Sequence, residues 1–568
     1  MTLLRSADAP PVSPEVIELS NTIAEQLLAA LKEAGVDRLF GIPGGGATAE
    51  LVSASKAAGI EFVLTQHETS AIIAAGVYGQ RTGTVGVALS AIGPGVANFA
   101  NGLAHAMLDR LPVLAIADRY RGGVHEVALR QQFDHLAMMR PVTKAQITLH
   151  EDTWDVGLRR AYRTALAERP GPVFIDFPNN VAGKTNRPAT PLRLLQPAYE
   201  ARVPAAALAE AAGVIGAARR PLILAGNTAL SLPAGTLARF ASVLRAPVLT
   251  SAKAKGAIAA DDPWCAGVFM GGKLEQVLLE QCDYIVFAGF DPVELLPKPW
   301  KVPVPALWLD RVPNIEQTAA VEAELIGDLG NTLAGLAEAL APAGTGGTRA
   351  ASTWSPEDCS RFHDSVRTQL TVPVDGLSPN DVVLAAREAA PRDTVLVTDV
   401  GANKLLSVEL WDAYGPHDFL MSNGLATMGF CLPAAQAVKL AEPDRPVLCL
   451  CGDAGFLMRL PELVTGRLID AGGVRRPIVY VIFADNEHSL ITVKQGKLGK
   501  HVHGLDFPSP GYADLSRAFG LACAEVDNLA DYRQALAEAF ARTDRSTLIA
   551  ARIDSSAYAK QFDIIREL

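Results

Sequence analysis

The sequence is poor in cysteine and lacks long apolar runs, and each absence excludes a class of protein. Seven cysteines are scattered over 568 residues, and an odd, sparse set does not form the disulfide framework of a small secreted domain. We therefore expect reduced thiols and a cytoplasmic protein. No apolar run is long enough to cross a bilayer, and residues 1–20 lack a basic start followed by an apolar stretch. The sequence thus predicts no membrane partner.

Positive charge is also scarce. Lys and Arg number 51 against 61 Asp and Glu, a net charge of −10, so a general nucleic-acid-binding surface is not expected. A dinucleotide fingerprint is missing too, because PGGGAT at residues 43–48 does not follow G-x-G-x-x-G. The chain does have an ordinary globular composition, 49% hydrophobic and 20% charged. Its 568 residues are too many for a single hydrophobic core, so several domains are expected.

Strand and helix signals alternate in three blocks. Short apolar runs that end in Gly, Pro, Asp or Asn, with helical stretches between them, indicate parallel α/β sheets. Loose segments at 186–204 and 341–358 separate the blocks, and the first dozen residues resemble a tail. We predict an α/β protein of three consecutive open parallel-sheet α/β domains, at residues 15–187, 203–342 and 376–560.

Polar residues stand directly after three predicted strands. Glu68 follows IEFVLTQH, Asp453 follows PVLCLCG, and Asn486 follows IVYVIFAD. Open parallel sheets bind ligands at the carboxyl ends of their strands. Taken alone, Asp453 in CGDAGF could simply cap the next helix, which we expect from Pro461 onward, and Asn486 could be a turn residue.

A metal and phosphate site is the functional alternative for this stretch. A carboxylate, an amide oxygen, backbone carbonyls and phosphate oxygens form the hard-oxygen site that Mg²⁺ takes. Gly452 and Gly455 would let phosphate oxygens approach the backbone at a helix N-terminus. Cys449 and Cys451 form a C-x-C pair, which alternation on a buried strand explains better than metal binding.

With the rest of the chain, this turn resembles the diphosphate–metal motif of thiamine-diphosphate-dependent enzymes, which reads Gly-Asp-Gly or Gly-Asp-Ala, a spacer, then Asn-Asn. Within that superfamily the chain is most similar to the acetolactate synthase group, which shades into benzaldehyde lyase-like carboligases. The similarity covers nearly the whole chain, because blocks occur in the family's order: FGIPGGG, HE, GPGVAN, LDRLPVLAI, RQQFDHLAMMRPVTK, RPGPVFIDFP, NGLATMGFCLPAA and GDAGFLMRLPEL. The resemblance implies pyrimidine-binding, central and diphosphate-binding domains in that order.

The resemblance also implies roles for single residues. Glu68 matches the glutamate that hydrogen-bonds N1′ of the aminopyrimidine and so promotes loss of the C2 proton, while the cofactor supplies the ylide. Asp453 and Asn486 match the side-chain metal ligands, and His488 matches the residue that lends a backbone carbonyl. Gln131 matches a glutamine near the substrate, although Gln132 is adjacent and either could face inward. Positions that match cofactor-contacting residues are Gly401, Ala402, Ala426, Met428, Gly452, Ala454 and Gly455.

Several positions depart from the family pattern. Asp485 replaces the first Asn of the usual pair, Ser489-Leu490 stands where a small stretch is usual, and Ile92 replaces a small polar residue. These changes leave cofactor binding intact and leave the substrate undetermined. The stretch after Gly455 is also longer than usual, around DAGGVRRP.

Proton-transferring side chains are few in the predicted pocket. The segment ADRYRGG lacks the histidine pair of pyruvate-decarboxylase-like enzymes, and Pro43 stands where benzaldehyde lyase-like enzymes have a histidine. This favours capture of the intermediate by a second carbonyl over its protonation to an aldehyde. Histidines that could still serve are His125, His135, His488, His501 and His503.

The resemblance predicts a carboligase that uses thiamine diphosphate and Mg²⁺. It would decarboxylate a 2-oxo acid and add the resulting enamine to an aldehyde or ketone acceptor. The alternatives are a C–C lyase or simple 2-oxo acid decarboxylase on the same cofactor, and a non-catalytic binding or regulatory protein of this fold. FAD stays an open alternative that AGNTALSLPAG and GFDPVELLPKPW do not favour. A homodimer or homotetramer is expected.

Overall fold

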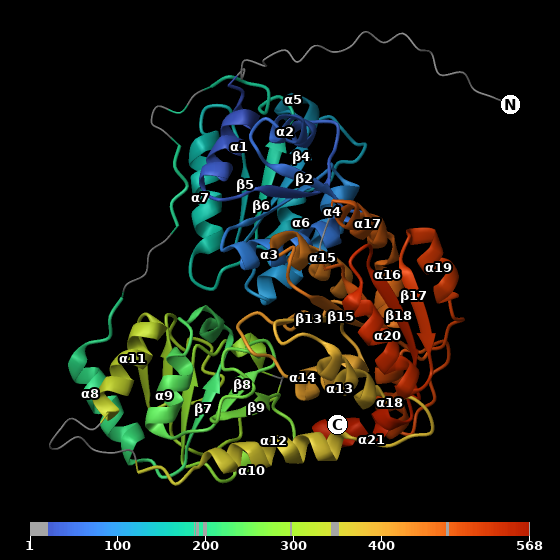
Figure 1. Ribbon diagram of the computed structural model, residues 1–568. Helices are drawn as coiled ribbons and strands as arrows, with labels where there is room; N and C mark the ends of the chain where they lie inside the picture. Colours follow the sequence, from blue (N-terminus) through green and yellow to red (C-terminus); the bar gives the residue numbers. More distant parts are fainter. Residues whose placement is uncertain are drawn as a thin grey trace.

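The computed structural model describes residues 21–186, 188, 192–196, 201–295, 298–341, 351–472 and 476–566. The predicted N-terminal tail lies outside these residues, as do parts of both predicted linkers and of the loop in DAGGVRRP. Three six-stranded sheets follow one another along the chain, and the strand pairings within them are parallel (Figure 1). The predicted fold class is therefore confirmed.

The first sheet has the strand order β2-β1-β3-β4-β6-β5. Its four inner strands are short and mostly buried, the two edge strands are partly exposed, and helices cover both faces, as expected for a parallel sheet. The strands are β1 (Arg38–Ile42), β2 (Glu61–Leu64), β3 (Gly86–Ser90), β4 (Val113–Arg119), β5 (Ala145–Thr148) and β6 (Val173–Pro178). The helices are α1 (Ile23–Glu33), α2 (Ala47–Ser55), α3 (Glu68–Thr82), α4 (Pro94–Leu108), α5 (Gly122–His125), α6 (His135–Met139) and α7 (Trp154–Leu166).

The central sheet has a different order, β12-β11-β10-β7-β8-β9. Counted along the chain, this is the 3-2-1-4-5-6 order of dinucleotide-binding folds. The strands are β7 (Pro221–Ala225), β8 (Val248–Ser251), β9 (Cys265–Phe269), β10 (Tyr284–Ala288), β11 (Ala306–Asp310) and β12 (Ala323–Ile326). The helices are α8 (Ala205–Ala217), α9 (Thr236–Leu244), α10 (Gln276–Leu279) and α11 (Leu329–Leu340), and α12 (Pro356–Leu370) leads to the next sheet.

The third sheet, β14-β13-β15-β16-β18-β17, repeats the strand order of the first. Its strands are β13 (Val395–Thr398), β14 (Phe419–Met421), β15 (Val447–Gly452), β16 (Val479–Ala484), β17 (Ala522–Val526) and β18 (Thr547–Arg552). The helices are α13 (Pro379–Ala389), α14 (Ala402–Leu410), α15 (Cys431–Ala441), α16 (Asp453–Met458), α17 (Leu463–Ala471), α18 (Ser489–Lys497), α19 (Tyr512–Phe519), α20 (Leu529–Ala541) and α21 (Ala557–Ile565).

The helix predicted from Pro461 begins differently. Helix α16 starts at Asp453 itself, a 3₁₀ turn spans Leu460–Glu462, and α17 follows from Leu463. The cause is local, since Pro461 stands in the first turn of the 3₁₀ helix, where its missing N–H costs no hydrogen bond.

The first and third domains share a hydrophobic core. Helices α3 and α15 pack against each other between the two sheets, as Figure 1 shows near the centre of the molecule. Buried residues of both helices, including Ile72, Ala75, Ala434 and Val438, belong to one apolar cluster. Among the helices of the described residues, none is both long and apolar enough to cross a bilayer.

Candidate active site

A cavity of about 170 Å³ opens at the carboxyl edge of the third sheet, between the ends of β13 and β15. The strand order reverses at this point, so the crevice is where an open α/β sheet binds its ligand. Its lining includes eight predicted site residues: Gly401, Ala402, Met428, Gly452, Asp453, Ala454, Gly455 and His488. The other lining residues are Val400, Asn403, Phe483, Asp485, Glu487, Ser489, Leu490, Ile491 and Tyr558.

Asp453 places a buried carboxylate in this cavity. The side chain is 1% exposed, and it accepts hydrogen bonds from the backbone N–H groups of Ala454 at 2.8 Å and Asn486 at 2.6 Å. Burial raises the pKa of Asp453, and these N–H donors oppose the shift. A carboxylate has about four lone-pair sites, so Asp453 keeps acceptor capacity directed at the cavity.

Asn486 contributes a buried oxygen that lacks a partner. Its backbone has φ of 58°, a conformation that Asn tolerates better than most residues. The backbone oxygen accepts from the N–H of Phe507 at 3.0 Å, whereas the side-chain Oδ1 has no hydrogen-bond partner. A buried acceptor without a partner is costly. Asn486 is not among the residues that line the cavity, but its backbone N–H bonds Asp453, and an amide oxygen and a carboxylate are ligand types that a hard divalent cation such as Mg²⁺ takes.

His488 lines the cavity, but its backbone carbonyl is already engaged. That oxygen accepts from the N–H groups of Ile491 at 2.8 Å and Thr492 at 3.2 Å in the first turn of α18. Its predicted contribution to a metal therefore stays a prediction. Beside it, Asp485 bonds the hydroxyl of Ser489, and burial is the main reason that the pKa of Asp485 rises to about 7. Asp485 thus tends toward its neutral form close to Asp453.

The Asp399 carboxylate lies next to Gly455, in the turn at residues 452–455. The Asp399 carboxylate accepts from the N–H of Gly429 at 3.0 Å and from Val400 at 2.7 Å. A Cβ added to Gly455 would lie 2.9 Å from Asp399 Oδ2, so a larger residue does not fit there. Asp399 therefore contacts both the turn at residues 452–455 and, through the N–H of Gly429, the backbone that follows Met428.

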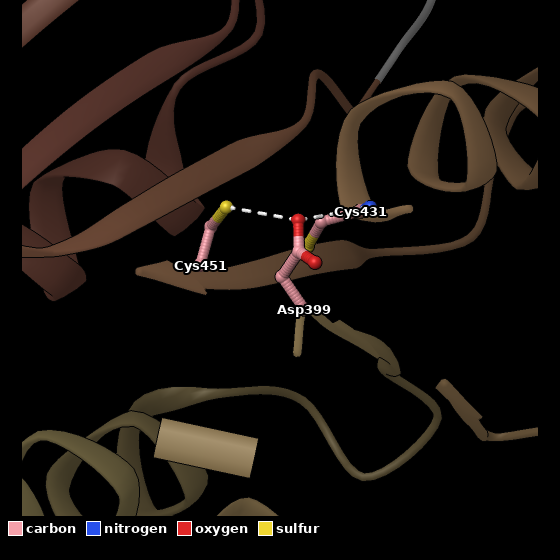
Figure 2. A group of neighbouring side chains, drawn as sticks. All are labelled: Asp399, Cys431 and Cys451. Atoms are coloured by element: carbon pink, nitrogen blue, oxygen red, sulfur yellow. Dashed lines mark hydrogen bonds between the residues drawn. The ribbon is translucent and has the colours of Figure 1, made fainter. Parts of the chain in front are cut away.

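Two buried thiols lie beside that carboxylate, and a third contacts one of them. Figure 2 shows Cys431 and Cys451 beside Asp399, and the Cys451 thiol lies 3.4 Å from Asp399 Oδ2. Cys431 Sγ is 2.7 Å from Cys449 Sγ and 3.2 Å from the Val397 carbonyl oxygen. Burial raises the pKa of the Cys431 and Cys451 thiols well above the ordinary value. Cys449 and Cys451 lie on buried strand β15, as the alternation predicts.

Glu68 lies at the start of α3, on the carboxyl edge of the first sheet. It is 8% exposed, and its Oε2 accepts from the Asn98 side-chain amide at 2.9 Å. Gly95 leaves room for it, since a Cβ there would lie 3.3 Å from Glu68 Oε1. None of the residues that line the cavity of the third sheet comes from the first domain, so Glu68 is not part of the lining around Asp453.

Four predicted site residues are not among those that line the cavity: Glu68, Asn486, Gln131 and Ala426. Gln131 is exposed, has φ of 57° and packs its backbone against Gly93. The adjacent Gln132 donates from its side-chain amide to the ring of His125 at 3.0 Å, so the two glutamines have different surroundings. Ala426 is exposed with φ of 55° and does not line the cavity. The roles of Gln131 and Ala426 stay predictions.

Comparison with known proteins agrees with this arrangement. The models of the thiamine pyrophosphate enzyme N-terminal TPP binding domain, central domain and C-terminal TPP binding domain match residues 21–138, 208–336 and 399–551. The acetolactate synthase large subunit of Parasynechococcus marenigrum is 32% identical over 524 residues, which cover 88% of this chain and 82% of that protein. The chain belongs to the thiamine-diphosphate-dependent, acetolactate synthase-like enzymes.

Two further relatives cover most of the chain at lower identity. Acetolactate synthase of Bacillus subtilis is 28% identical over 531 residues, which cover 90% of each chain. The catabolic acetolactate synthase of Raoultella terrigena is 28% identical over 542 residues, which cover 94% of this chain and 95% of that protein.

The cavity of this acetolactate synthase-like enzyme fits the diphosphate end of the cofactor. Gly401 and Ala402 form the start of α14 and face the cavity, and a helix N-terminus favours an anion. Gly452 and Gly455 keep the opposite wall free of side chains. The Asp453 carboxylate and the partnerless Asn486 Oδ1 would hold the metal between the protein and the diphosphate.

A buried carboxyl lies at the switch point of the central sheet, between the ends of β7 and β10. A Cβ on Gly226 would lie 2.6 Å from Glu294 Oε2 and 2.3 Å from Phe290 Cα. Glu294 accepts from the backbone N–H of Asn227 and Asp291 at 3.0 and 2.9 Å and from Ser251 Oγ. Groups of the central domain thus pack closely in this crevice, and FAD stays an open alternative.

Sequence reasoning missed several residues that shape the site. Asp399 stands directly after a predicted strand, in TDVG, and the rule that found Asp453 would have found it. Asn98 lies in the GPGVAN block but gives no signal of its contact with Glu68. Tyr558 comes from the last helix, and its place in the cavity depends on how α21 returns to the sheet.

Proposed function

We propose that this protein is a thiamine-diphosphate- and Mg²⁺-dependent carboligase. It decarboxylates a 2-oxo acid and joins the remaining acyl unit to a second carbonyl compound. The observation that carries the proposal is the buried Asp453 carboxylate in a cavity that glycines and a helix N-terminus also line. Asp453 contacts the backbone of Asn486, whose side-chain Oδ1 has no hydrogen-bond partner. Relatives described as acetolactate synthases over most of the chain support the same reaction class.

Residues of the third domain bind and orient the cofactor. Asp453 and Asn486 would hold Mg²⁺, and the N-terminus of α14 would receive the diphosphate. When bound, thiamine diphosphate supplies a carbon nucleophile and an electron sink for decarboxylation. Met428 lines the cavity. It matches a cofactor-contacting position of the family and would lie against the aminopyrimidine ring.

Glu68 holds a proton at N1′ of the aminopyrimidine. Asn98 fixes one carboxylate oxygen at 2.9 Å and leaves Oε1 for this contact. Burial at 8% exposure keeps water from competing, which strengthens a hydrogen bond between the carboxylate and a ring nitrogen. Glu68 is therefore the acid–base residue of the proposal.

The cavity has both apolar and proton-carrying side chains. Phe483, Leu490 and Ile491 give it apolar surface, whereas Asp485, His488 and Tyr558 are lining residues that can carry a proton. A carboligase therefore requires that the intermediate react with a second carbonyl compound before one of these groups protonates it. The identities of the 2-oxo acid and the acceptor are not part of the proposal.

We infer a homodimer as the smallest active assembly, because Glu68 is not among the residues that line the diphosphate cavity of its own chain. The exposed segment next to Gln131 supports this, because Val127 and Leu129 are 76% and 93% exposed and such apolar surface usually marks a contact. In a two-fold dimer, the first domain of one subunit would complete the cavity of the other.

Product analysis tests the reaction. The purified protein with thiamine diphosphate and Mg²⁺ is incubated with a panel of 2-oxo acids, with and without acceptor aldehydes. We expect CO₂ and a new 2-hydroxy ketone or 2-hydroxy-2-oxo-acid-type adduct that depends on both substrates. Free aldehyde as the sole organic product would show a simple decarboxylase instead, and the absence of any turnover with bound cofactor would favour a non-catalytic protein.

Mixing two inactive variants tests the assembly. A subunit with Glu68→Gln and a subunit with Asp453→Ala, refolded or co-expressed together, place both defects in one site of the mixed dimer and leave the other site intact. Random pairing should restore roughly a quarter of the parental activity. Restoration of none, with mixed dimers confirmed by mass, would contradict a site shared between subunits.

A further inference from the structure

Asp109 is the residue at which the three domains meet. It follows the last residue of α4 and is 1% exposed. Its Oδ1 accepts from Lys253 Nζ of the central domain at 2.8 Å and from the backbone N–H of Asn423 in the third domain at 3.1 Å. Its Oδ2 lies 2.9 Å from Nδ1 of His105 on its own helix. One buried carboxylate thus contacts elements of all three domains.

His105 extends this contact to the segment before Met428. Its Nδ1 is 3.0 Å from Ser422 Oγ, and the Ser422 hydroxyl oxygen accepts from the backbone N–H of Thr427 at 2.9 Å. The His105 ring is 1% exposed and packs against Phe430, with ring centroids 5.2 Å apart. The turn from Ser422 to Thr427 is therefore closed around a hydroxyl that the first domain holds.

The same segment is fixed at two other points. Lys404 Nζ, on α14, donates to the Ser422 carbonyl oxygen at 3.2 Å. Gly424 packs directly on the end of α4, where an added Cβ would lie 2.6 Å from Leu108 Cβ. Residues 422–427 therefore lie between α14, whose start faces the cavity, and the end of α4, and they lead directly into Met428.

The charge balance at the junction favours an ionised Asp109. Burial by itself raises the pKa of this carboxyl, but the Lys253 ammonium and His105 outweigh burial and hold the pKa well below its ordinary value. Removing the carboxylate would leave Lys253 buried beside the Asp109 carbonyl without a counter-charge and the Asn423 N–H without an acceptor. The segment would then lose its attachment to the first domain.

We propose that Asp109 is a positioning residue that, with His105, sets the backbone of residues 422–428 and so the place of Met428 in the cavity. This inference rests on the proposed function, because Met428 matters only if the cavity holds the cofactor. Asp109 touches neither cofactor nor substrate; it acts through Asn423 and Ser422. A small displacement of a positioning element costs up to about 10²-fold in rate.

Hydrogen–deuterium exchange of the cofactor-free protein tests the positioning directly. Asp109→Ala should increase exchange in peptides that cover residues 422–428, whereas Asp109→Asn, which keeps an acceptor for the Asn423 N–H, should restore much of the protection. Ser422→Ala removes the hydroxyl without changing any charge, and it should raise exchange in the same peptides even if Asp109→Ala fails to fold.

Arg110→Met is the matched control. Arg110 is the next residue and also joins the first domain to the central one, through Asp291 at 2.6 and 3.1 Å, but these bonds do not involve residues 422–428. The Arg110→Met variant should have a lower melting temperature but unchanged hydrogen–deuterium exchange in the peptides that cover residues 422–428. Equal changes in Arg110→Met and Asp109→Ala would overturn the proposal, because the effect would then be a general loosening of the domain contacts.

The cofactor supplies a second measurement. NMR follows exchange of the C2 proton of bound thiamine diphosphate, and we expect Asp109→Ala and Ser422→Ala to slow it by about tenfold to 10²-fold while Arg110→Met does not. An unchanged rate in both variants would overturn the positioning role. A parent protein that fails to exchange C2–H would instead contradict the proposed function, and the amide-exchange result would still decide the role of Asp109.

Discussion

The first and third sheets have the same strand order, but the helix that follows the first strand begins in different surroundings in the two sheets. In the first sheet, the Asp118 carboxylate accepts from the N–H groups of Gly46 at 3.1 Å and Thr48 at 2.7 Å, at the start of α2. In the third sheet, the corresponding residues Gly401 and Ala402, at the start of α14, line the cavity.

The difference shows that strand order alone does not make a ligand site. A helix N-terminus attracts negative charge, and the first domain satisfies that attraction with its own carboxylate. In the third domain the start of α14 faces the cavity instead, where our proposal places the diphosphate. The central sheet is a second filled case, because the buried Glu294 carboxyl occupies its switch point. Function therefore depends on which strand-end groups remain without partners after folding.

The largest effect is expected at Glu68. Glu68→Gln keeps the size and the contact with Asn98 but cannot share a proton with N1′ in the same way. Exchange of the cofactor C2 proton should slow by about 10²–10⁴-fold, while thiamine diphosphate affinity changes little, since the diphosphate cavity is untouched. NMR of C2–H/D exchange and calorimetry measure the two quantities. Parental exchange in the variant would remove Glu68 from the mechanism.

Asp453→Ala should weaken the binding of Mg²⁺ and thiamine diphosphate, whereas Glu68→Gln should slow exchange of the cofactor C2 proton. The change removes the anionic ligand of the cavity, and since loss of a supporting group alone often costs 10–100-fold in metal affinity, we expect a loss of at least about 10²-fold. Calorimetric titration with Mg²⁺ and thiamine diphosphate checks this. Unchanged affinity would refute the metal assignment and make Asp453 a simple helix cap.

The stability that Glu294 contributes to the central domain should depend on pH. Burial raises the pKa of Glu294 from 4.5 to about 7, so the folded protein keeps this proton at pH values where the unfolded chain has released it. The stability from this group is present below about pH 4.5 and is lost as pH rises to about 7. The melting temperature of the parent relative to Glu294→Gln should therefore fall across that window. A constant difference would contradict the raised pKa.

Glycine substitutions compare the two edges directly. Gly455→Ala brings a Cβ within 2.9 Å of Asp399 Oδ2, whereas a Cβ on Gly45 in the first domain meets nothing within 4 Å. We expect Gly455→Ala to cost about 1–3 kcal/mol of unfolding free energy and to weaken cofactor binding, and Gly45→Ala to do neither. Denaturant unfolding and calorimetry on both variants test this. Equal behaviour of the pair would show that the tight turn is not needed.

The smallest effect is expected at Asp118. Asp118→Asn keeps an oxygen at the start of α2 but removes the charge, so unfolding free energy should fall by about 1 kcal/mol. Thiamine diphosphate affinity should stay at the parental value, because α2 is not the diphosphate helix. A clear loss of affinity would mean that the two sheet edges are less independent than their structures indicate.

The sequence predicted the parts of the site that depend on neighbouring residues. Asp453 ends a buried strand at a glycine turn, Asn486 ends the next one, and both lie where the rule for open sheets places them. Cys449 and Cys451 alternate on β15 as their spacing indicates. Such features are readable because strand, turn and helix start are set within a few residues.

Contacts between distant residues were not readable in this way. Nothing near Asp109 in the sequence indicates Lys253 or Asn423, and nothing in QQ distinguishes exposed Gln131 from Gln132 beside His125. The carbonyl of His488 accepts hydrogen bonds in the first turn of α18, a contact that the sequence did not indicate, and its contribution to a metal stays a prediction. These outcomes depend on how helices return to the sheets and on which donors arrive there first.

The sequence by itself therefore determined the three parallel sheets, the family and the strand-end residues that offer oxygen ligands, since each follows from local patterns of apolar and turn residues. The tertiary structure alone decided which of those polar groups find partners. Asp118 and Glu294 are satisfied by backbone N–H groups of their own domains, whereas Asn486 Oδ1 has no partner. Because a buried polar group without a partner costs free energy, that group defines where the protein can gain most from a ligand.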